Sequence, residues 1–140
     1  MVREVSFEGI GYQAATFKVD ETTVAALKEK YLDAATGKVD VAGKNLGVKL
    51  SGDDTVGFGT GAAEDALFGI IVKYEEDGFA SVQYAGFAVE VPTTGAIALA
   101  NTELAVDASG LVANVTGAKS NGIVTKAATS GDKFATIKLG

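Results

Sequence analysis

The chain of 140 residues contains no cysteine, no histidine and no tryptophan. Without cysteine it has neither a disulfide framework nor thiolate chemistry. Without histidine it lacks the commonest general base and the commonest transition-metal ligand. Catalysis would have to rest on carboxylates, lysines or tyrosines alone. We therefore expect a protein that is not an enzyme and that binds no cofactor and no metal.

Positive charge is also scarce, since 12 Lys and Arg face 18 Asp and Glu and give a net charge of −6. Such a chain repels the phosphate backbone unless a local basic stripe overrides the balance, and the sequence has no such stripe. It has no apolar run of the roughly 20 residues that a membrane span needs, and no signal-peptide pattern at its start. We expect neither nucleic acid nor a membrane as a partner.

What the chain does contain is enough apolar sequence to fold, because 47% of its residues are apolar. Its length predicts one domain. Residues 1–19 alternate between apolar and polar side chains, but Gly9 and Gly11 interrupt the alternation. We interpret residues 1–19 as an extended N-terminal arm and residues 20–140 as a single β domain that includes a helix.

The arm carries four large apolar side chains that must be buried somewhere: Phe7, Ile10, Tyr12 and Phe17. The arm can fold onto its own β domain, or it can dock onto a neighbouring subunit. The residues leave both alternatives open. These four side chains are the candidate partner-binding site.

One helix is predicted, over residues 20–34. Asp20 can cap its start, and Val24, Leu27 and Tyr31 fall on one apolar stripe. Gly37 is expected to end it. The stripe is typical of core packing and not of a cofactor site.

After residue 38 the apolar period shifts to two, which predicts many short strands separated by glycine-rich turns. Asp77-Gly78 is the strongest hairpin signal, Asp107–Gly110 joins a second pair, and Pro92 is placed at a strand end. The expected fold class is mainly β, a small barrel or sandwich. Beyond residue 54, the predicted strands are 55–60, 67–74, 79–84, 86–91, 96–99, 103–106, 111–115, 122–126 and 133–139.

A short sequence pattern occurs twice in the chain. Gly69-Ile70 followed by Phe79–Tyr84 recurs as Gly122-Ile123 followed by Phe134–Leu139. The pattern predicts strands at equivalent places in two successive substructures. The similarity arises either because strands and turns share the same residue preferences or because the segment was duplicated. Val48–Leu50 and Leu104–Val106 extend the match.

Two further motifs are interpreted as structural. The loop Gly57–Gly61 has the glycines of a phosphate loop, but acidic residues follow it where a helix and phosphates would lie. The acidic pairs Asp53-Asp54 and Glu64-Asp65, and the run at 75–77, match no calcium-loop spacing and are expected to be solvated turn carboxylates.

The arrangement resembles the head-decoration, or capsid cement, proteins of tailed bacteriophages. The resemblance is carried by short motifs along most of the chain: Phe7–Phe17, Val56–Thr60, Leu67–Ile71 and Leu104–Val112. The helix at 20–34 departs from the simplest members of that family.

The resemblance implies a β-barrel or β-tulip-like domain that binds the outside of an assembled capsid. It implies the major capsid protein as partner, a homotrimer on the capsid, and an arm that reaches across capsomer boundaries. The protein would be found on the virion exterior and, during assembly, in the host cytoplasm. The alternative is a small β-barrel module that binds a carbohydrate or host-surface ligand, against which the lack of tryptophan argues.

Overall fold

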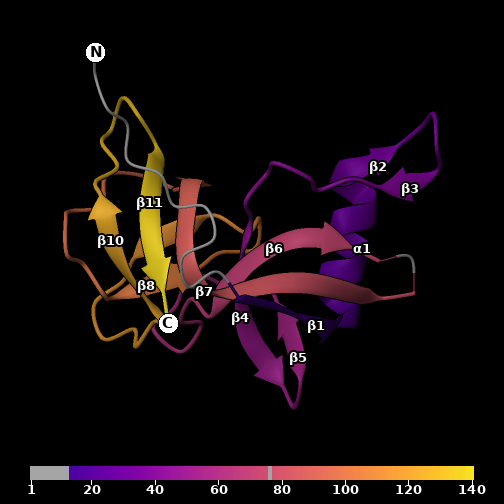
Figure 1. The fold of residues 1–140 in the computed structure, drawn as a ribbon, viewed down its shortest axis with the longest axis horizontal. Coiled ribbons are helices and arrows are strands. Elements are labelled where there is room, and N and C mark those ends of the chain that lie inside the picture. The colour runs from indigo at the N-terminus through magenta and orange to yellow at the C-terminus, as the bar shows by residue number, and fades with distance from the viewer. Residues whose placement is uncertain (1–12, 76) are drawn as a thin grey trace.

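The structure is a computed structural model that describes residues 13–75 and 77–140 (Figure 1). In these residues it has one helix and eleven strands. In chain order they are β1 (Gln13–Val19), α1 (Glu21–Tyr31), β2 (Leu32–Asp33), β3 (Lys38–Val39), β4 (Gly47–Gly52), β5 (Thr55–Gly57), β6 (Gly69–Tyr74), β7 (Phe79–Pro92), β8 (Leu104–Val106), β9 (Val112–Asn114), β10 (Gly122–Lys126) and β11 (Phe134–Leu139).

Five strands close into a barrel in the order β1-β5-β4-β6-β7, and β1 pairs again with β7. β1 runs parallel to β5, and the other barrel pairs are antiparallel. Closure leaves this part of the sheet without a free edge. The prediction of a mainly β fold built on a small barrel is confirmed. Residues 13–19 are expected in the N-terminal arm, but they form the first barrel strand because they pair with both β5 and β7.

β7 is shared by two halves of the molecule. Its first half pairs with β1 and β6, and its second half pairs with β11, which in turn pairs with β10. Gly86 lies between the halves with φ of 91°, a backbone conformation that suits glycine. The sequence predicts two strands here, but the chain forms one strand that bends. We call residues 13–85 the barrel lobe and residues 86–140 the C-terminal lobe.

Each lobe has its own hydrophobic core. The core of the barrel lobe consists of Val19, Leu27, Val39, Val41, Leu46, Val48, Val56, Ile71, Tyr74, Ala80 and Val82. The core of the C-terminal lobe consists of Ala88, Val91, Ile97, Leu104, Val106, Val112, Val124, Ala128, Ala135, Ile137 and Leu139, and it closes against Leu67 and Ile70 of the barrel lobe. Phe58 packs against both cores and so ties the lobes together.

The helix begins as predicted and ends earlier than predicted. The Asp20 carboxylate accepts a hydrogen bond from the backbone N–H of Thr23 at 2.8 Å, and Leu27 is fully buried in the barrel core. The helix ends at Tyr31 and not at residue 34, because Asp33 forms a turn of its own. Its carboxylate accepts the N–H of Ala35 and its carbonyl accepts the N–H of Gly37. Gly37 therefore lies in the β2–β3 turn, which projects beyond α1 (Figure 1).

Most of the predicted hairpins are present. Asp77-Gly78 lies in the turn from β6 to β7, and Gly78 has φ of 86°. The Asp107–Gly110 turn joins β8 to β9, with the Asp107 carboxylate accepting the N–H groups of Ser109 and Leu111. Pro92 ends β7 as predicted. Residues 96–99 do not form a named strand, and only Ile97 makes a single bridge, with Ala128.

The repeated pattern forms two equivalent antiparallel hairpins. In the first, Ile70 of β6 lies opposite Gln83 of β7, and in the second, Ile123 of β10 lies opposite Lys138 of β11. The equivalence does not extend to Val48–Leu50 and Leu104–Val106. β4 pairs with β5 and β6, whereas β8 pairs with β9. The sequence match therefore holds for the hairpins alone.

Candidate functional site

Three of the four candidate partner-binding residues, Phe7, Ile10 and Tyr12, lie outside the described residues. The fourth, Phe17, is on β1 and is half-buried. Its ring packs edge-to-face against Phe68, with ring centroids 5.4 Å apart and planes at 78°. Phe17 therefore contributes to the core of its own barrel, and a partner can contact only the rest of its surface.

The glycine-rich loop at 57–61 has no backbone N–H left for a phosphate at positions 58 to 61. The N–H of Phe58 donates to Thr23 Oγ1, and that of Gly59 to the Asp107 carbonyl. The N–H of Thr60 donates to the Asp65 carboxylate, and that of Gly61 to the Val106 carbonyl. A phosphate loop needs these groups free. The structural interpretation of the loop is confirmed.

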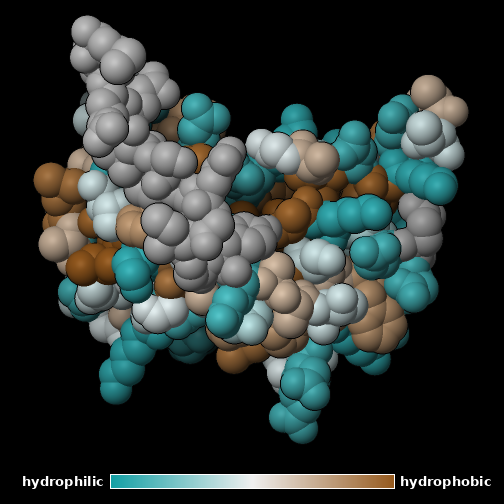
Figure 2. Space-filling view, viewed as in Figure 1, coloured by the Kyte–Doolittle hydropathy of each residue, from teal (hydrophilic) through white to brown (hydrophobic). Residues whose placement is uncertain are grey.

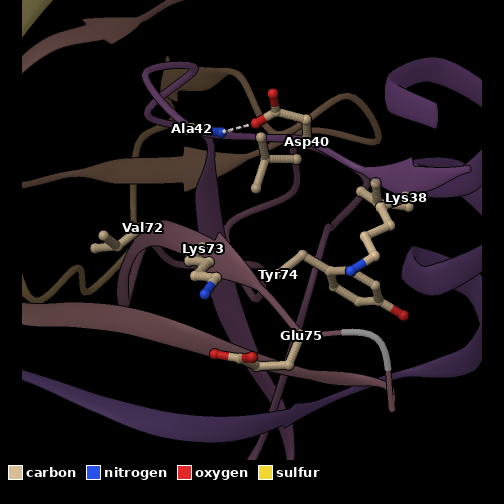
Figure 3. A pocket seen from close by; sticks show the side chains of 9 residues that line it. Lys38, Asp40, Ala42, Val72, Lys73, Tyr74 and Glu75 are labelled. Carbon is tan, nitrogen blue, oxygen red and sulfur yellow. Dashed lines mark hydrogen bonds between the residues drawn. The ribbon is translucent and has the colours of Figure 1, made fainter. Parts of the chain in front are cut away.

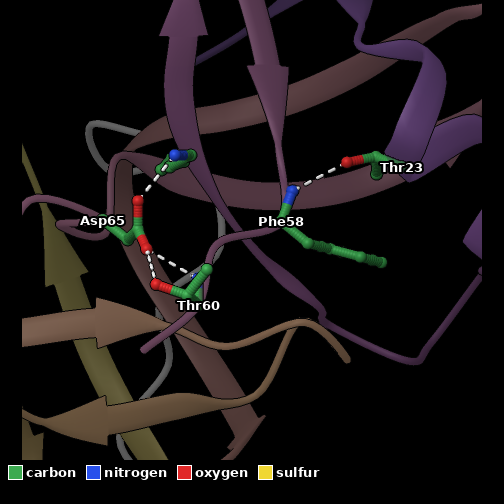
Figure 4. Close-up of polar contacts among 5 residues, drawn as sticks. Thr23, Phe58, Thr60 and Asp65 are labelled. Carbon is green, nitrogen blue, oxygen red and sulfur yellow. Dashed lines mark hydrogen bonds and ion pairs between the residues drawn. The ribbon is translucent and has the colours of Figure 1, made fainter. Parts of the chain in front are cut away.

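Asp65 lies at the centre of the contacts around this loop and is buried, with 3% of its surface exposed. Lys49 Nζ lies 2.6 Å from Oδ1, while the backbone N–H and the hydroxyl of Thr60 both donate to Oδ2 (Figure 4). The hydrogen bond from Lys49, and then those from Thr60, hold the pKa of the Asp65 carboxyl well below its ordinary value, although burial opposes this. We expect this carboxylate to hold the loop against β4.

The expectation of solvated turn carboxylates is therefore wrong for Asp65. Its partner on β4 is 16 residues away, a separation at which no local pattern reveals an ion pair. The one sequence signal is the position of Asp65 directly before the apolar run Ala66–Phe68. Asp53 and Asp54 are exposed in the β4–β5 turn, as predicted. Among residues 13–75 and 77–140, no group of three or more acidic side chains is arranged to hold a metal ion.

Two surface hollows lie close to β6, and both are lined by polar and apolar side chains. The hollow in Figure 3 has a volume of about 470 Å³ and lies between residues 38–42 and the end of β6. Lysine and carboxylate side chains both line it, and Asp40 already accepts the N–H of Ala42 at 3.1 Å. Tyr74 contributes to the hollow but is 6% exposed and belongs to the barrel core.

A smaller hollow of about 250 Å³ continues from Val72 toward the second half of β7. Asn45 forms part of its wall and donates from its side-chain amide to the carbonyls of Val89 and Glu90. Gln83 donates in the same way to the carbonyls of Ala85 and Phe87. Two side-chain amides thus bind the backbone at the bend between the lobes.

Apolar side chains also reach the surface on several different elements, and of these only Val72 and Val89 line the two hollows just described. The large hydrophobic residues that are exposed are Leu32, Leu50, Val72, Phe79, Val89, Leu99 and Phe134. They are divided between both lobes and do not converge on one cavity. Single exposed apolar side chains of this kind are common on the surfaces of folded proteins.

Within the described residues, every buried side-chain nitrogen and oxygen has a hydrogen-bond partner, and no helix is both long and apolar enough to cross a bilayer. No protein-family model matches the chain, and no curated protein matches it significantly.

Proposed function

We propose that this chain is a virion structural protein that binds the outer surface of an assembled phage capsid and stabilises it across the joints between capsomers. The proposal begins from the resemblance in strand rhythm and turn motifs. Its partner is the major capsid protein, and its site of action is the capsid exterior.

The observation that carries the proposal is the distribution of apolar surface. The exposed hydrophobic side chains sit on strands and turns of both lobes, from Leu32 on β2 to Phe134 on β11. These side chains are only 39–62% exposed, so burying the rest of one contributes about 1 kcal/mol. A protein that binds several neighbouring subunits at once needs apolar side chains on more than one of its faces. The weak affinities of the individual contacts then combine into tight binding to the whole shell.

The position at which β1 begins supports the same role. β1 begins at Gln13, whose partner on β7 is Ala85, one residue before the bend at Gly86. Residues 13–16 are exposed, so β1 begins at the surface near the junction of the lobes. The twelve residues before it can span up to about 40 Å when extended. That length is enough to reach a neighbouring subunit.

The test is a binding experiment with a variant that lacks residues 1–12 and begins with a methionine before Gln13. Wild-type protein is expected to pellet with shells of the major capsid protein, and the variant is expected to stay in the supernatant. Circular dichroism is the control, because the barrel must remain folded. If the folded variant binds shells as tightly as the wild type, the arm does not make the contact.

The carbohydrate-binding alternative has a separate readout. Its place would be the hollow of about 470 Å³ beside β6. No aromatic face is open there for a sugar to stack on, since Tyr74 is buried. Phe79, however, is 39% exposed and lines a more open hollow of about 560 Å³ that also includes Glu75. The lack of tryptophan, rather than the shape of the surface, favours the capsid role. Specific binding to a glycan array, lost on substitution of Lys73 and Glu75, would reverse that preference.

A further inference from the structure

Charge is distributed unequally between the two lobes. The C-terminal lobe, residues 86–140, contains four acidic residues and four lysines. The other 14 acidic and eight basic residues all lie in residues 1–85. The C-terminal lobe therefore has no net charge, and the whole net charge of −6 belongs to the first 85 residues. Two copies of the chain repel each other least when their C-terminal lobes meet.

The longest uncharged stretch of this lobe runs from the end of β7 toward β8. Residues 91–102 contain no charged side chain. Leu99 is 62% exposed, more than any other large hydrophobic residue that the structure describes, and Ala98 and Ala100 beside it are also exposed. We call residues 96–101 the neutral edge. Figure 2 shows hydrophobic surface on the outer side of this lobe, at the left of the view.

The neutral edge is held firmly against β10 and the segment that follows it. Ile97 and Ala128 exchange two backbone hydrogen bonds, of 2.9 and 3.0 Å. The N–H of Ala100 donates to the Val124 carbonyl, and the N–H of Val124 donates to the Asn101 carbonyl. Leu99 is therefore presented on a turn that is fixed on both sides. A surface that is already ordered loses less conformational entropy when it binds.

The backbone of this turn is also strained. Ala100 has φ of 63°, in the left-handed region that costs an alanine about 1 kcal/mol. Strain of this kind persists where surrounding contacts impose it. Here the strained residue, Ala100, directly follows the exposed Leu99 in a segment without charged side chains.

We propose that the neutral edge is a self-association surface, and that the partner is the neutral edge or the adjacent surface of the C-terminal lobe in a second copy of this chain. Contact there buries Leu99 without bringing the two acidic regions together. The proposal concerns the protein alone in solution and does not depend on the proposed capsid role.

The test is sedimentation velocity of the full chain over a wide concentration range, with Leu99→Glu as the variant. Leu32→Glu is the matched control, because Leu32 is 53% exposed, lies in the barrel lobe and undergoes the same change in charge. We expect the wild type to self-associate reversibly. Leu99→Glu is expected to weaken association at least roughly tenfold, and Leu32→Glu to leave it within about twofold.

Salt provides a second readout that does not depend on folding of a variant. A contact between uncharged surfaces of two acidic molecules should strengthen when salt screens their mutual repulsion. A wild type that stays monomeric at all concentrations would overturn the proposal. So would association that weakens with salt, or that Leu32→Glu disrupts as much as Leu99→Glu does.

Discussion

The side-chain amide of Asn121 donates a hydrogen bond of 2.9 Å to the backbone carbonyl of Tyr84, 37 residues earlier in the chain. The same amide donates to the carbonyl of Phe68, and the backbone N–H of Asn121 donates to the carbonyl of Leu67. The carbonyl of Asn121 accepts the N–H of Gly140. One residue thus joins the start of β6, the bend of β7 and the end of β11, where the two equivalent hairpins meet.

Replacing Asn121 by alanine should lower the free energy of unfolding by about 2–4 kcal/mol, because two backbone carbonyls lose their donor at a partly buried site. Urea unfolding at neutral pH measures the change. Asn114→Ala is the control, since Asn114 is exposed at the end of β9 and should change stability by less than about 0.5 kcal/mol. Equal effects of the two substitutions would mean that Asn121 does not join the hairpins.

Asp65→Asn should destabilise the fold at neutral pH by about 2–4 kcal/mol, because Lys49 loses its carboxylate partner at a buried site. The pKa of Asp65 is lowered in the folded state. Its stabilising contribution is therefore complete above the unfolded pKa of about 3.9 and is lost as the pH falls below that value.

The difference in stability between wild type and Asp65→Asn should accordingly be constant from neutral pH to about pH 5 and should shrink below about pH 4. Chemical denaturation at a series of pH values provides the profile. Asp53→Asn, at an exposed turn position, serves as the control. A difference that grows as the pH falls would contradict the assignment of Asp65 as a stabilising buried anion.

Gly86→Ala should destabilise the protein by about 1–3 kcal/mol, because φ of 91° is unfavourable for any residue with a Cβ atom. Thermal unfolding is the measurement. The matched control is Gly95→Ala, since a Cβ atom added at Gly95 would meet no other atom within 4 Å and its φ is not positive. If both variants unfold at the same temperature, the bend in β7 does not require glycine.

Ala100→Gly should have the opposite effect on stability. It should raise the free energy of unfolding by about 0.5–1 kcal/mol, because glycine adopts the left-handed backbone without strain. Ala98→Gly, in the same exposed turn but at ordinary φ, should lower it slightly. Urea unfolding of the two variants distinguishes a strained Ala100 from a turn that tolerates glycine everywhere. A loss of stability in Ala100→Gly would contradict the strain.

The hairpins can be predicted from sequence because their signals are local. Gly69-Ile70 and Gly122-Ile123 recur since both hairpins need a glycine at the same place. A Cβ atom on Gly69 would meet the carbonyl oxygen of Gln83, and one on Gly122 would lie 2.7 Å from the Ile137 side chain. The Asp20 cap and the Leu27 stripe are local in the same sense, and both are confirmed.

The features that sequence does not predict depend on contacts between distant segments. Sequence places Phe17 in the arm because nothing near it shows that β1 pairs with both β5 and β7. The ion pair of Asp65 with Lys49 escapes sequence analysis for the same reason. Ala100 carries no sequence signal of its left-handed backbone, which its neighbours on β10 impose. Long-range pairing decides these features.

The capsid role is tested most directly by particles from the organism that encodes this chain. Virus particles are banded on a density gradient, and mass spectrometry quantifies the protein in the fraction of DNA-filled heads. Our account predicts that it bands with the heads in amounts comparable to the major shell protein. Recovery only in the soluble fraction would contradict that account and favour a ligand-binding module.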